Sequence, residues 1–288
     1  MSQDYSKRFL FQEADIRGCI VRLSNSFTDC YSHQEYREPI LHLLGEFLTA
    51  APLLGNSLKF TGRLVLQAKA AEPVSLVMSE FASDSKIRGI VRGSYPELDS
   101  LDMSSLFKDG TLAITIESSQ GERYQSLVPV SASTLSECLS YYFQQSEQLA
   151  TQIILHCDGR TATGFMLQQL PTQQLHSEES RDQQWQHCCL MASTISSREL
   201  LDLPDELLIS KLYGDWDVSL YKPVPINFHC DCSQQRMANA LLALGEQELK
   251  DLLEQQQTLS IQCEFCGESY QMGRDTIIRA AQGRNKPH

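Results

Sequence analysis

Alternating apolar and polar residues dominate residues 1–171 and form short segments separated by Pro, Gly, Asp and Ser. A period of two residues places every second side chain on one face, which is typical of strands in a sheet with one buried face. The pattern predicts strands over 15–24, 58–69, 74–81, 86–93, 111–118, 123–130, 152–158 and 164–170. Their close succession favours antiparallel pairing.

Two segments of this region have helical spacing instead. In YREPILHLLGEFLTA, residues 36–50, apolar residues recur three and four positions apart, and Pro39 suits the first turn of a helix. A second helix is predicted over 133–149, with Thr134 or the preceding serine as its N-cap. Strands with helices packed against them predict an α+β fold for residues 1–171, built on an antiparallel sheet.

The composition changes after Pro171. Residues 172–187 contain only Leu175 and Trp185 as large apolar side chains, which marks a boundary. Apolar residues then recur at helical spacing in two stretches, whose apolar faces need a surface to cover. They are Trp185, Cys188, Cys189, Ala192 and Ile195 in the first stretch, and Leu200, Leu201, Leu207 and Leu208 in the second. The pattern predicts an amphipathic helical linker over 172–226, packed on the preceding domain.

The last segment, 227–288, is small. It is predicted to contain short helices over 233–244 and 245–256, and it is too short to build a self-sufficient core. Domains of this size usually depend on disulfides, a metal ion or a partner for stability. The sequence therefore predicts a C-terminal domain that needs such a constraint.

The charge balance argues against two classes of partner. The chain has 36 Asp and Glu against 24 Lys and Arg, a formal net charge of −12, without a segregated basic patch. Such a surface repels nucleic-acid phosphates and anionic membranes. The most apolar segment, 40–55, is interrupted by His42, Glu46 and Pro52 and is too short to span a bilayer. The N-terminus has no apolar run of signal-peptide length, so we expect a cytoplasmic protein without nucleic-acid or membrane partners.

Four of the ten cysteines form two close pairs, Cys230-x-Cys232 and Cys263-x-x-Cys266. In an extended chain, residues i and i+2 face the same way about 6.6 Å apart, and Gly267 suits the tight turn after the second pair. In a reducing compartment these cysteines remain thiols. Four thiolates fit tetrahedral Zn²⁺ with Zn–S bonds of about 2.3 Å, so we predict one zinc ion per chain. An iron–sulfur cluster and two metal-free redox pairs remain alternatives.

The other cysteines and two histidines have simpler interpretations. Three isolated cysteines are expected in the core, namely Cys19, Cys138 and Cys157. His229 adjoins the first cysteine pair, but four sulfurs already complete the tetrahedron. His187 lies beside Cys188, yet no partner acid accompanies it, so an ordinary helix position is expected. We assign no function to Cys188 and Cys189.

A closed four-cysteine zinc site is most often an inert structural staple. However, zinc-bound sulfur remains thiolate at neutral pH, so an oxidant that reaches it can convert the ligands to disulfides. Structural zinc contributes about 10–16 kcal/mol in small peptides, so ligand oxidation would remove most of what folds this segment. The site can therefore serve as a reversible switch.

The sequence lacks the signatures of common enzymes: a Walker loop, G-x-S-x-G, H-E-x-x-H and G-x-G-x-x-G. We therefore expect a protein that is not an enzyme. A zinc-containing thiol–disulfide oxidoreductase remains the alternative, because both cysteine pairs can exchange disulfides. Such enzymes usually place the motif at the start of a helix, whereas Cys230 follows a Pro-rich extended run and Cys263 ends a strand-like one.

Taken together, these features resemble the redox-regulated 33-kilodalton heat shock protein family of bacterial holdase chaperones. The resemblance rests on C-x-C, a spacer and C-x-x-C-G near the C-terminus of an acidic chain, and on further motifs. Those motifs are GERYQ at 121–125, YYFQQSEQL at 141–149, GFMLQQLP at 164–171 and LPDELLISKLY at 203–213. At the start of the motif at 164–171 the family often has a Gly-Gly pair. In this chain Thr163 occupies the first of these two positions, and only Gly164 is retained.

The resemblance implies an ATP-independent chaperone that is quiescent while reduced and zinc-bound. Oxidation of four cysteines to two disulfides would release zinc, unfold the C-terminal region and the linker, and expose apolar surface that holds unfolding client proteins. An oxidised homodimer and later transfer of clients to an ATP-dependent foldase are also implied. The implied zinc ligands and redox-active thiols are Cys230, Cys232, Cys263 and Cys266. The implied domains are a chaperone core over 1–171, the linker over 172–226 and a redox-switch domain over 227–288.

Overall fold

The computed structural model describes residues 4–58, 60–94, 102–172, 177–242, 258–273 and 277. The chain divides into two compact units. The first contains residues 1–30 and 35–228, and the second contains residues 31–34 and 229–288. The expected linker lies within the first unit, and the three-part division made from the sequence stays a prediction.

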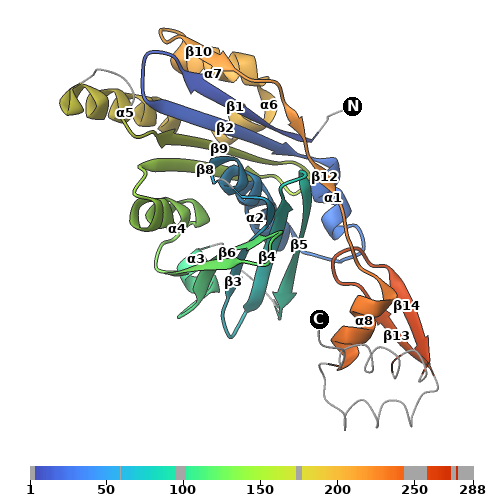
Figure 1. Ribbon diagram of the computed structural model, residues 1–288. Helices are drawn as coiled ribbons and strands as arrows, with labels where there is room; N and C mark the ends of the chain where they lie inside the picture. The colour runs from blue at the N-terminus through green and yellow to red at the C-terminus, as the bar shows by residue number, and fades with distance from the viewer. Residues whose placement is uncertain are drawn as a thin grey trace. The chain divides into compact units, whose positions relative to one another are not determined.

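Two sheets form the first unit (Figure 1). One contains β1 (Tyr5–Phe11), β2 (Ile16–Leu23), β8 (Thr151–Cys157), β9 (Ala162–Gln169), β10 (Val218–Leu220) and β11 (Val224–Pro225). The other contains β3 (Gly62–Lys69), β4 (Val74–Ala82), β5 (Lys86–Gly93), β6 (Thr111–Ser118), β7 (Arg123–Pro129) and β12 (Asn227–Phe228). Their orders are β10-β1-β2-β9-β8, with β11 also on β1, and β12-β5-β4-β3-β6-β7. Pairing is antiparallel except between β12 and β5, so the expected α+β fold with an antiparallel sheet is confirmed.

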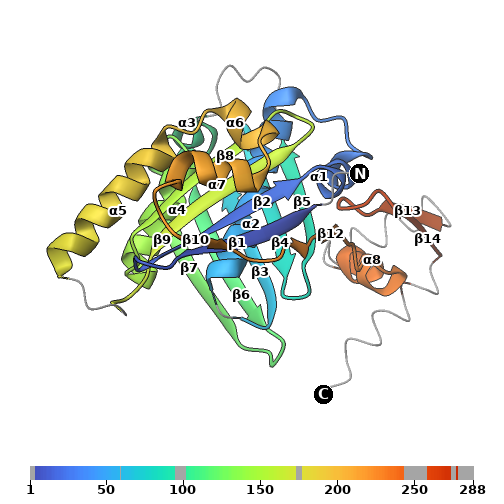
Figure 2. The same ribbon diagram turned by 90° about the horizontal axis from the view of Figure 1, so that it is seen from above.

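The long helix α2 (Glu38–Ser57) contacts strands of both sheets (Figure 2). Pro39 lies in its first turn, as the sequence predicts. The helix continues past the predicted end and through Pro52, because burial between two sheets outweighs the hydrogen bond that proline removes. At Gly164 on β9, a Cβ atom would lie 2.8 Å from Leu53 Cδ1, so glycine permits this close packing.

All eight predicted strands are confirmed, with shifted ends. Four strands of the first unit were missed: β1, whose pattern is interrupted by Lys7 and Arg8, and the very short β10, β11 and β12. The second predicted helix is α4 (Leu135–Tyr142), which continues only as a π-turn over Phe143–Glu147, and Thr134 caps it. Thr163 lies in the regular β2–β9 ladder rather than in a turn, so its departure from the family pattern disturbs no turn geometry.

Three helices of the expected linker pack on the first sheet: α5 (Glu178–Ser193), α6 (Ser197–Asp202) and α7 (Asp205–Tyr213). Two shorter helices, α1 (Asn25–Tyr31) and α3 (Met103–Leu106), complete the first unit. The predicted second helical stretch is divided in two at Leu203–Pro204, because a helix rarely continues into the residue before proline. After α7 the linker becomes extended and adds β10 and β11 to the edge of the sheet.

The second unit is a small module with its own apolar cluster. It contains α8 (Gln234–Leu241) and a hairpin of β13 (Thr258–Gln262) and β14 (Ser269–Gly273). Among the residues described in this module, five side chains are buried in the cluster: Ala238, Leu241, Leu259, Met272 and Ile277. The helix predicted over 245–256 lies outside the described residues. Within the part of the chain that the structure describes, no helix is both long and apolar enough to cross a membrane.

One carboxyl group in α2 makes stability depend on pH near neutrality. Burial raises the pKa of Glu46 from 4.5 to about 7, so the folded state favours the protonated form. This contribution is favourable at low pH and is lost as pH rises from 4.5 through 7. We expect Glu46→Gln to stabilise the protein by about 2–3 kcal/mol at pH 8. Urea unfolding should show this gain shrinking toward pH 5, whereas an equal gain at both pH values would contradict the assignment.

Candidate metal and redox site

Two separate segments of the second unit supply the paired cysteines. Cys230 and Cys232 lie on irregular chain just after β12 and before α8, while Cys263 directly follows β13 and Cys266 lies in the turn before β14. The turn is closed by hydrogen bonds from Gly267 N to Cys263 O, 2.8 Å, and from Cys263 N to Glu268 O, 2.9 Å. Gly267 has φ +74°, the left-handed conformation that glycine adopts most readily.

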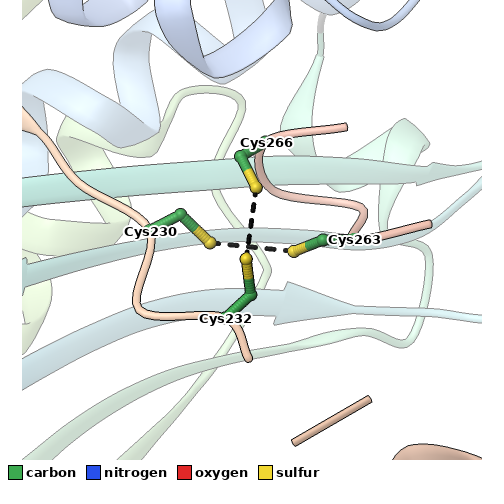
Figure 3. Close-up of side chains that lie close together, drawn as sticks. All are labelled: Cys230, Cys232, Cys263 and Cys266. Carbon is green, nitrogen blue, oxygen red and sulfur yellow. Dashed lines mark hydrogen bonds between the residues drawn. The ribbon is translucent and has the colours of Figure 1, made fainter. Parts of the chain in front are cut away.

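The four sulfur atoms converge on one point (Figure 3). All lie within 4.8 Å of one another. Cys230 Sγ is 3.7 Å from Cys263 Sγ, and Cys232 Sγ is 3.4 Å from Cys266 Sγ. A tetrahedron with metal–sulfur bonds of about 2.3 Å has edges of about 3.8 Å, so the sulfur positions fit one tetrahedral ion. The arrangement can therefore hold a metal ion between two chain segments.

The thiols differ in their surroundings. Cys263 is 3% exposed, and the other three are half-buried. Burial raises the pKa of Cys230 and Cys266, and at Cys230 a backbone hydrogen bond from Cys232 and a side-chain hydrogen bond with Cys266 oppose the rise only in part. Burial also raises the pKa of Cys232, but hydrogen bonds, chiefly from Tyr270, outweigh it and hold that pKa below its ordinary value. Cys232 therefore ionises more readily than an isolated cysteine.

Tyr270 contacts the cysteine cluster, and the sequence reasoning did not predict this. It lies on β14, and its hydroxyl is 3.2 Å from Cys232 Sγ. Donation to the sulfur explains why the pKa of Tyr270 is raised, since deprotonation would break the bond. One sequence signal could have pointed to Tyr270. It is an aromatic residue that follows shortly after a C-x-x-C pair, on the returning strand of the hairpin.

The remaining cysteines and histidines stay outside this cluster. His229 is exposed and is not among the grouped ligands in the described part of the chain. Burial raises the pKa of Cys188 and of Cys189 to about 12, so neither is an activated thiol. The exposed His187 lies near Trp216, with ring centroids 6.2 Å apart. The expected core cysteines Cys19, Cys138 and Cys157 are all buried.

A second feature is the apolar face that α5, α6 and α7 cover. On the sheet side it consists of Phe9, Phe11, Ile16, Ile20, Phe165 and Leu167. From the helices, Leu200 and Leu208 are fully buried on it, with Trp185 and Ile195 packed at its margin. The expected packing of Leu207 is wrong: this side chain is 52% exposed, because it lies on the outer face of α7.

Comparisons with known proteins agree with this architecture. The family model described as "Hsp33 protein" matches residues 4–273. A protein named "33 kDa chaperonin" from Pseudomonas paraeruginosa is 43% identical over 282 residues, covering 97% of this chain and 95% of that protein. One of the same name from Azotobacter vinelandii is 39% identical over the same length and shares.

A solved structure has the same fold. The crystal structure of the 33 kDa chaperonin from Thermotoga maritima superposes with a TM-score of 0.77 at 20% sequence identity, covering 97% of this chain and 98% of that one. The match of the family model to nearly the whole chain, together with relatives above 40% identity, establishes the relationship. This chain belongs to the Hsp33 family of chaperones.

Proposed function

We propose that this protein is a redox-regulated, ATP-independent holdase that binds unfolding client proteins when its four clustered cysteines are oxidised. The convergence of Cys230, Cys232, Cys263 and Cys266 carries the proposal. The covered apolar face on the first sheet supplies a surface for clients. Membership of a chaperone family supports both statements.

In the reduced state the four thiolates hold one Zn²⁺ per chain. The all-sulfur ligand set suits zinc or iron–sulfur clusters rather than magnesium or calcium, and sulfurs converging on one centre favour a single ion. When bound, zinc supplies folding free energy to the second unit, of about 10–16 kcal/mol in comparable small sites. The apolar cluster in the described part of this unit is small, so the contribution is large by comparison.

Oxidation then removes the ligands. Each pair of thiolates gives two electrons to one molecule of peroxide, and with two protons from the solvent this forms one disulfide and two molecules of water. Two disulfides consume all four thiols and leave no thiolate for the metal ion. Half-exposed sulfurs at three of the four positions are accessible to a small oxidant.

The switch acts through three successive segments of the chain. Residues 227–288 form the redox-switch domain, 172–226 the linker and 1–171 the chaperone core. Loss of the metal unfolds the switch domain, and the linker helices then leave the apolar face. The oxidised form dimerises and holds clients until an ATP-dependent foldase accepts them. The protein acts in the cytoplasm, without catalytic turnover and without nucleic-acid or membrane partners.

One experiment tests these steps together. Reduced protein is treated with peroxide at elevated temperature while zinc release, free thiols and light scattering by an unfolding client are followed in the same samples. The proposal predicts that one zinc leaves as four thiols disappear and that client scattering falls. Retention of zinc with reduced thiols would make the site an inert staple, and catalytic reduction of a model disulfide would favour an oxidoreductase.

Tyr270→Phe removes the hydroxyl that donates to Cys232 Sγ but keeps the ring. Outer hydrogen bonds of this kind typically change metal affinity about 10- to 100-fold, so we expect zinc affinity to fall about tenfold. Competition with a chromogenic chelator measures the change. Ser269→Ala, on the same strand with an exposed side chain, is the matched control. Equal affinities in the two variants would show that the hydroxyl does not support the site.

A further inference from the structure

The corner between α6 and α7 is built around one arginine of the sheet. Arg22 on β2 donates from Nε to Asp205 Oδ1, 2.8 Å. Its Nη1 donates to Leu200 O, 2.8 Å, and to Leu201 O, 3.0 Å, and its Nη2 donates to Leu203 O, 2.7 Å. One guanidinium thus binds the last carbonyls of α6 and the first side chain of α7. These carbonyls have no partner within their own helix, so they need an external donor.

Asp205 completes the arrangement from the linker side. Its Oδ2 accepts from Tyr5 Oη, 2.7 Å, and from Lys7 Nζ, 2.9 Å, both on β1. The carboxylate is 0% exposed, and the side chain of Arg22 is 14% exposed. Burial raises the pKa of Asp205, but the hydrogen bonds from its three donors hold it below its ordinary value. The carboxylate is therefore ionised and fully paired.

These contacts differ in kind from the apolar ones beside them. Apolar side chains tolerate small shifts of a helix on a sheet, whereas a forked guanidinium bonded to three carbonyls and a carboxylate allows one register. Removing one partner of a buried ion pair leaves the other charge without compensation, which strongly disfavours the packed state. All the residues involved lie in the first unit, whereas the cysteine ligands lie in the second.

We propose that Arg22 and Asp205 are positioning residues that lock the linker helices α6 and α7 onto the sheet, and that breaking this pair releases them while the cysteine site keeps its metal ion. The inference deepens the proposed function, since the released linker is the state that exposes client-binding surface. Asp205, the first of the two acidic residues in LPDELL, holds the linker helices in place through its contact with Arg22 on β2.

The test compares Asp205→Asn with Glu206→Gln in full-length, reduced, zinc-loaded protein. The two changes remove the same charge at adjacent positions, but Glu206 is 70% exposed and accepts only from Lys7 among the side chains of the first sheet that the structure describes. Hydrogen exchange by mass spectrometry follows peptides of 178–213 separately from β3–β6, and zinc content is measured alongside. We expect exchange in 178–213 to be at least tenfold faster in Asp205→Asn and within twofold of the parent in Glu206→Gln.

The outcomes separate the lock from the chaperone function. Faster exchange confined to 178–213, with zinc retained and client scattering suppressed without oxidant, supports both. The same exchange without suppression supports the lock and contradicts the proposed function. Unchanged exchange overturns the lock, and so does equal acceleration in β3–β6, which would make Asp205 a general core contact. Arg22→Lys keeps the charge but loses the fork, so it should give an intermediate acceleration in the same peptides.

Discussion

Replacing Cys263 by serine is expected to abolish metal binding and to unfold the second unit. Cys263 is the most buried of the four clustered cysteines, and its sulfur lies 3.7 Å from that of Cys230. The remaining three thiols cannot close a tetrahedron, so most of the roughly 10–16 kcal/mol that structural zinc supplies is lost. That loss is as large as the total stability of a typical domain, about 5–15 kcal/mol. The described part of this unit has a small apolar cluster, which cannot replace the lost free energy.

Zinc content by atomic emission and trypsin cleavage at Arg236, within α8, measure this effect. Zinc should fall from about one ion per chain to a trace, and cleavage should become rapid without oxidant. Cys189→Ser, at a half-buried thiol of α5, is the control and should keep its zinc. Full zinc occupancy in Cys263→Ser would contradict the ligand assignment. Under the proposed function, the variant also suppresses client aggregation while reduced.

The second large effect is expected at Phe11, where β1 meets the linker. The ring is 1% exposed and packs edge-on against Tyr213, with centroids 5.0 Å apart, and Trp216, 5.7 Å apart. Truncating a buried phenylalanine typically costs about 3–5 kcal/mol through lost contacts and the cavity that remains. Because both partners lie at the end of α7 and beyond it, we expect Phe11→Ala to destabilise the first unit and to loosen the linker.

Urea unfolding of the reduced protein, followed by tryptophan fluorescence, measures this loss, since Trp185 and Trp216 both lie in or beside the linker. Leu10→Ala is the control, because Leu10 is the preceding residue on β1 and its half-buried side chain lies on the opposite face. We expect Leu10→Ala to lower the free energy of unfolding by at most half as much as Phe11→Ala, because less surface is buried at Leu10. Equal costs would mean that the linker contacts of Phe11 add nothing to ordinary strand packing.

Local patterns predicted most of the sheet and the central helix. The period-two runs at 58–69 and 111–118 contain β3 and β6, and the apolar face with Pro39 became α2. Each of these signals is contained in about ten consecutive residues, which is the range over which side-chain periodicity reports an element. The short edge strands β10 and β11 carry no such signal, because their extended form depends on pairing with β1.

In the cysteine site too, local spacing predicted some features and tertiary structure decided another. Spacing alone predicted that Cys230, Cys232, Cys263 and Cys266 would converge, because C-x-C and C-x-x-C restrict where each pair of sulfurs points. Spacing did not reveal Tyr270, whose hydroxyl reaches Cys232 from a residue 38 positions away. Its placement depends on the β13–β14 register, which pairs Tyr270 with Ile261.

The amino-acid sequence by itself determined most of the elements, the grouping of four cysteines and the net negative charge, since each follows from residue type and spacing. The tertiary structure alone decided which buried charge meets which. Arg22 and Asp205 are separated by 183 positions, and neither segment carries a sequence pattern that predicts contact with the other. Their pairing arises because β2 and the α6–α7 corner are brought together by apolar burial, and a buried charge then requires a partner at that place.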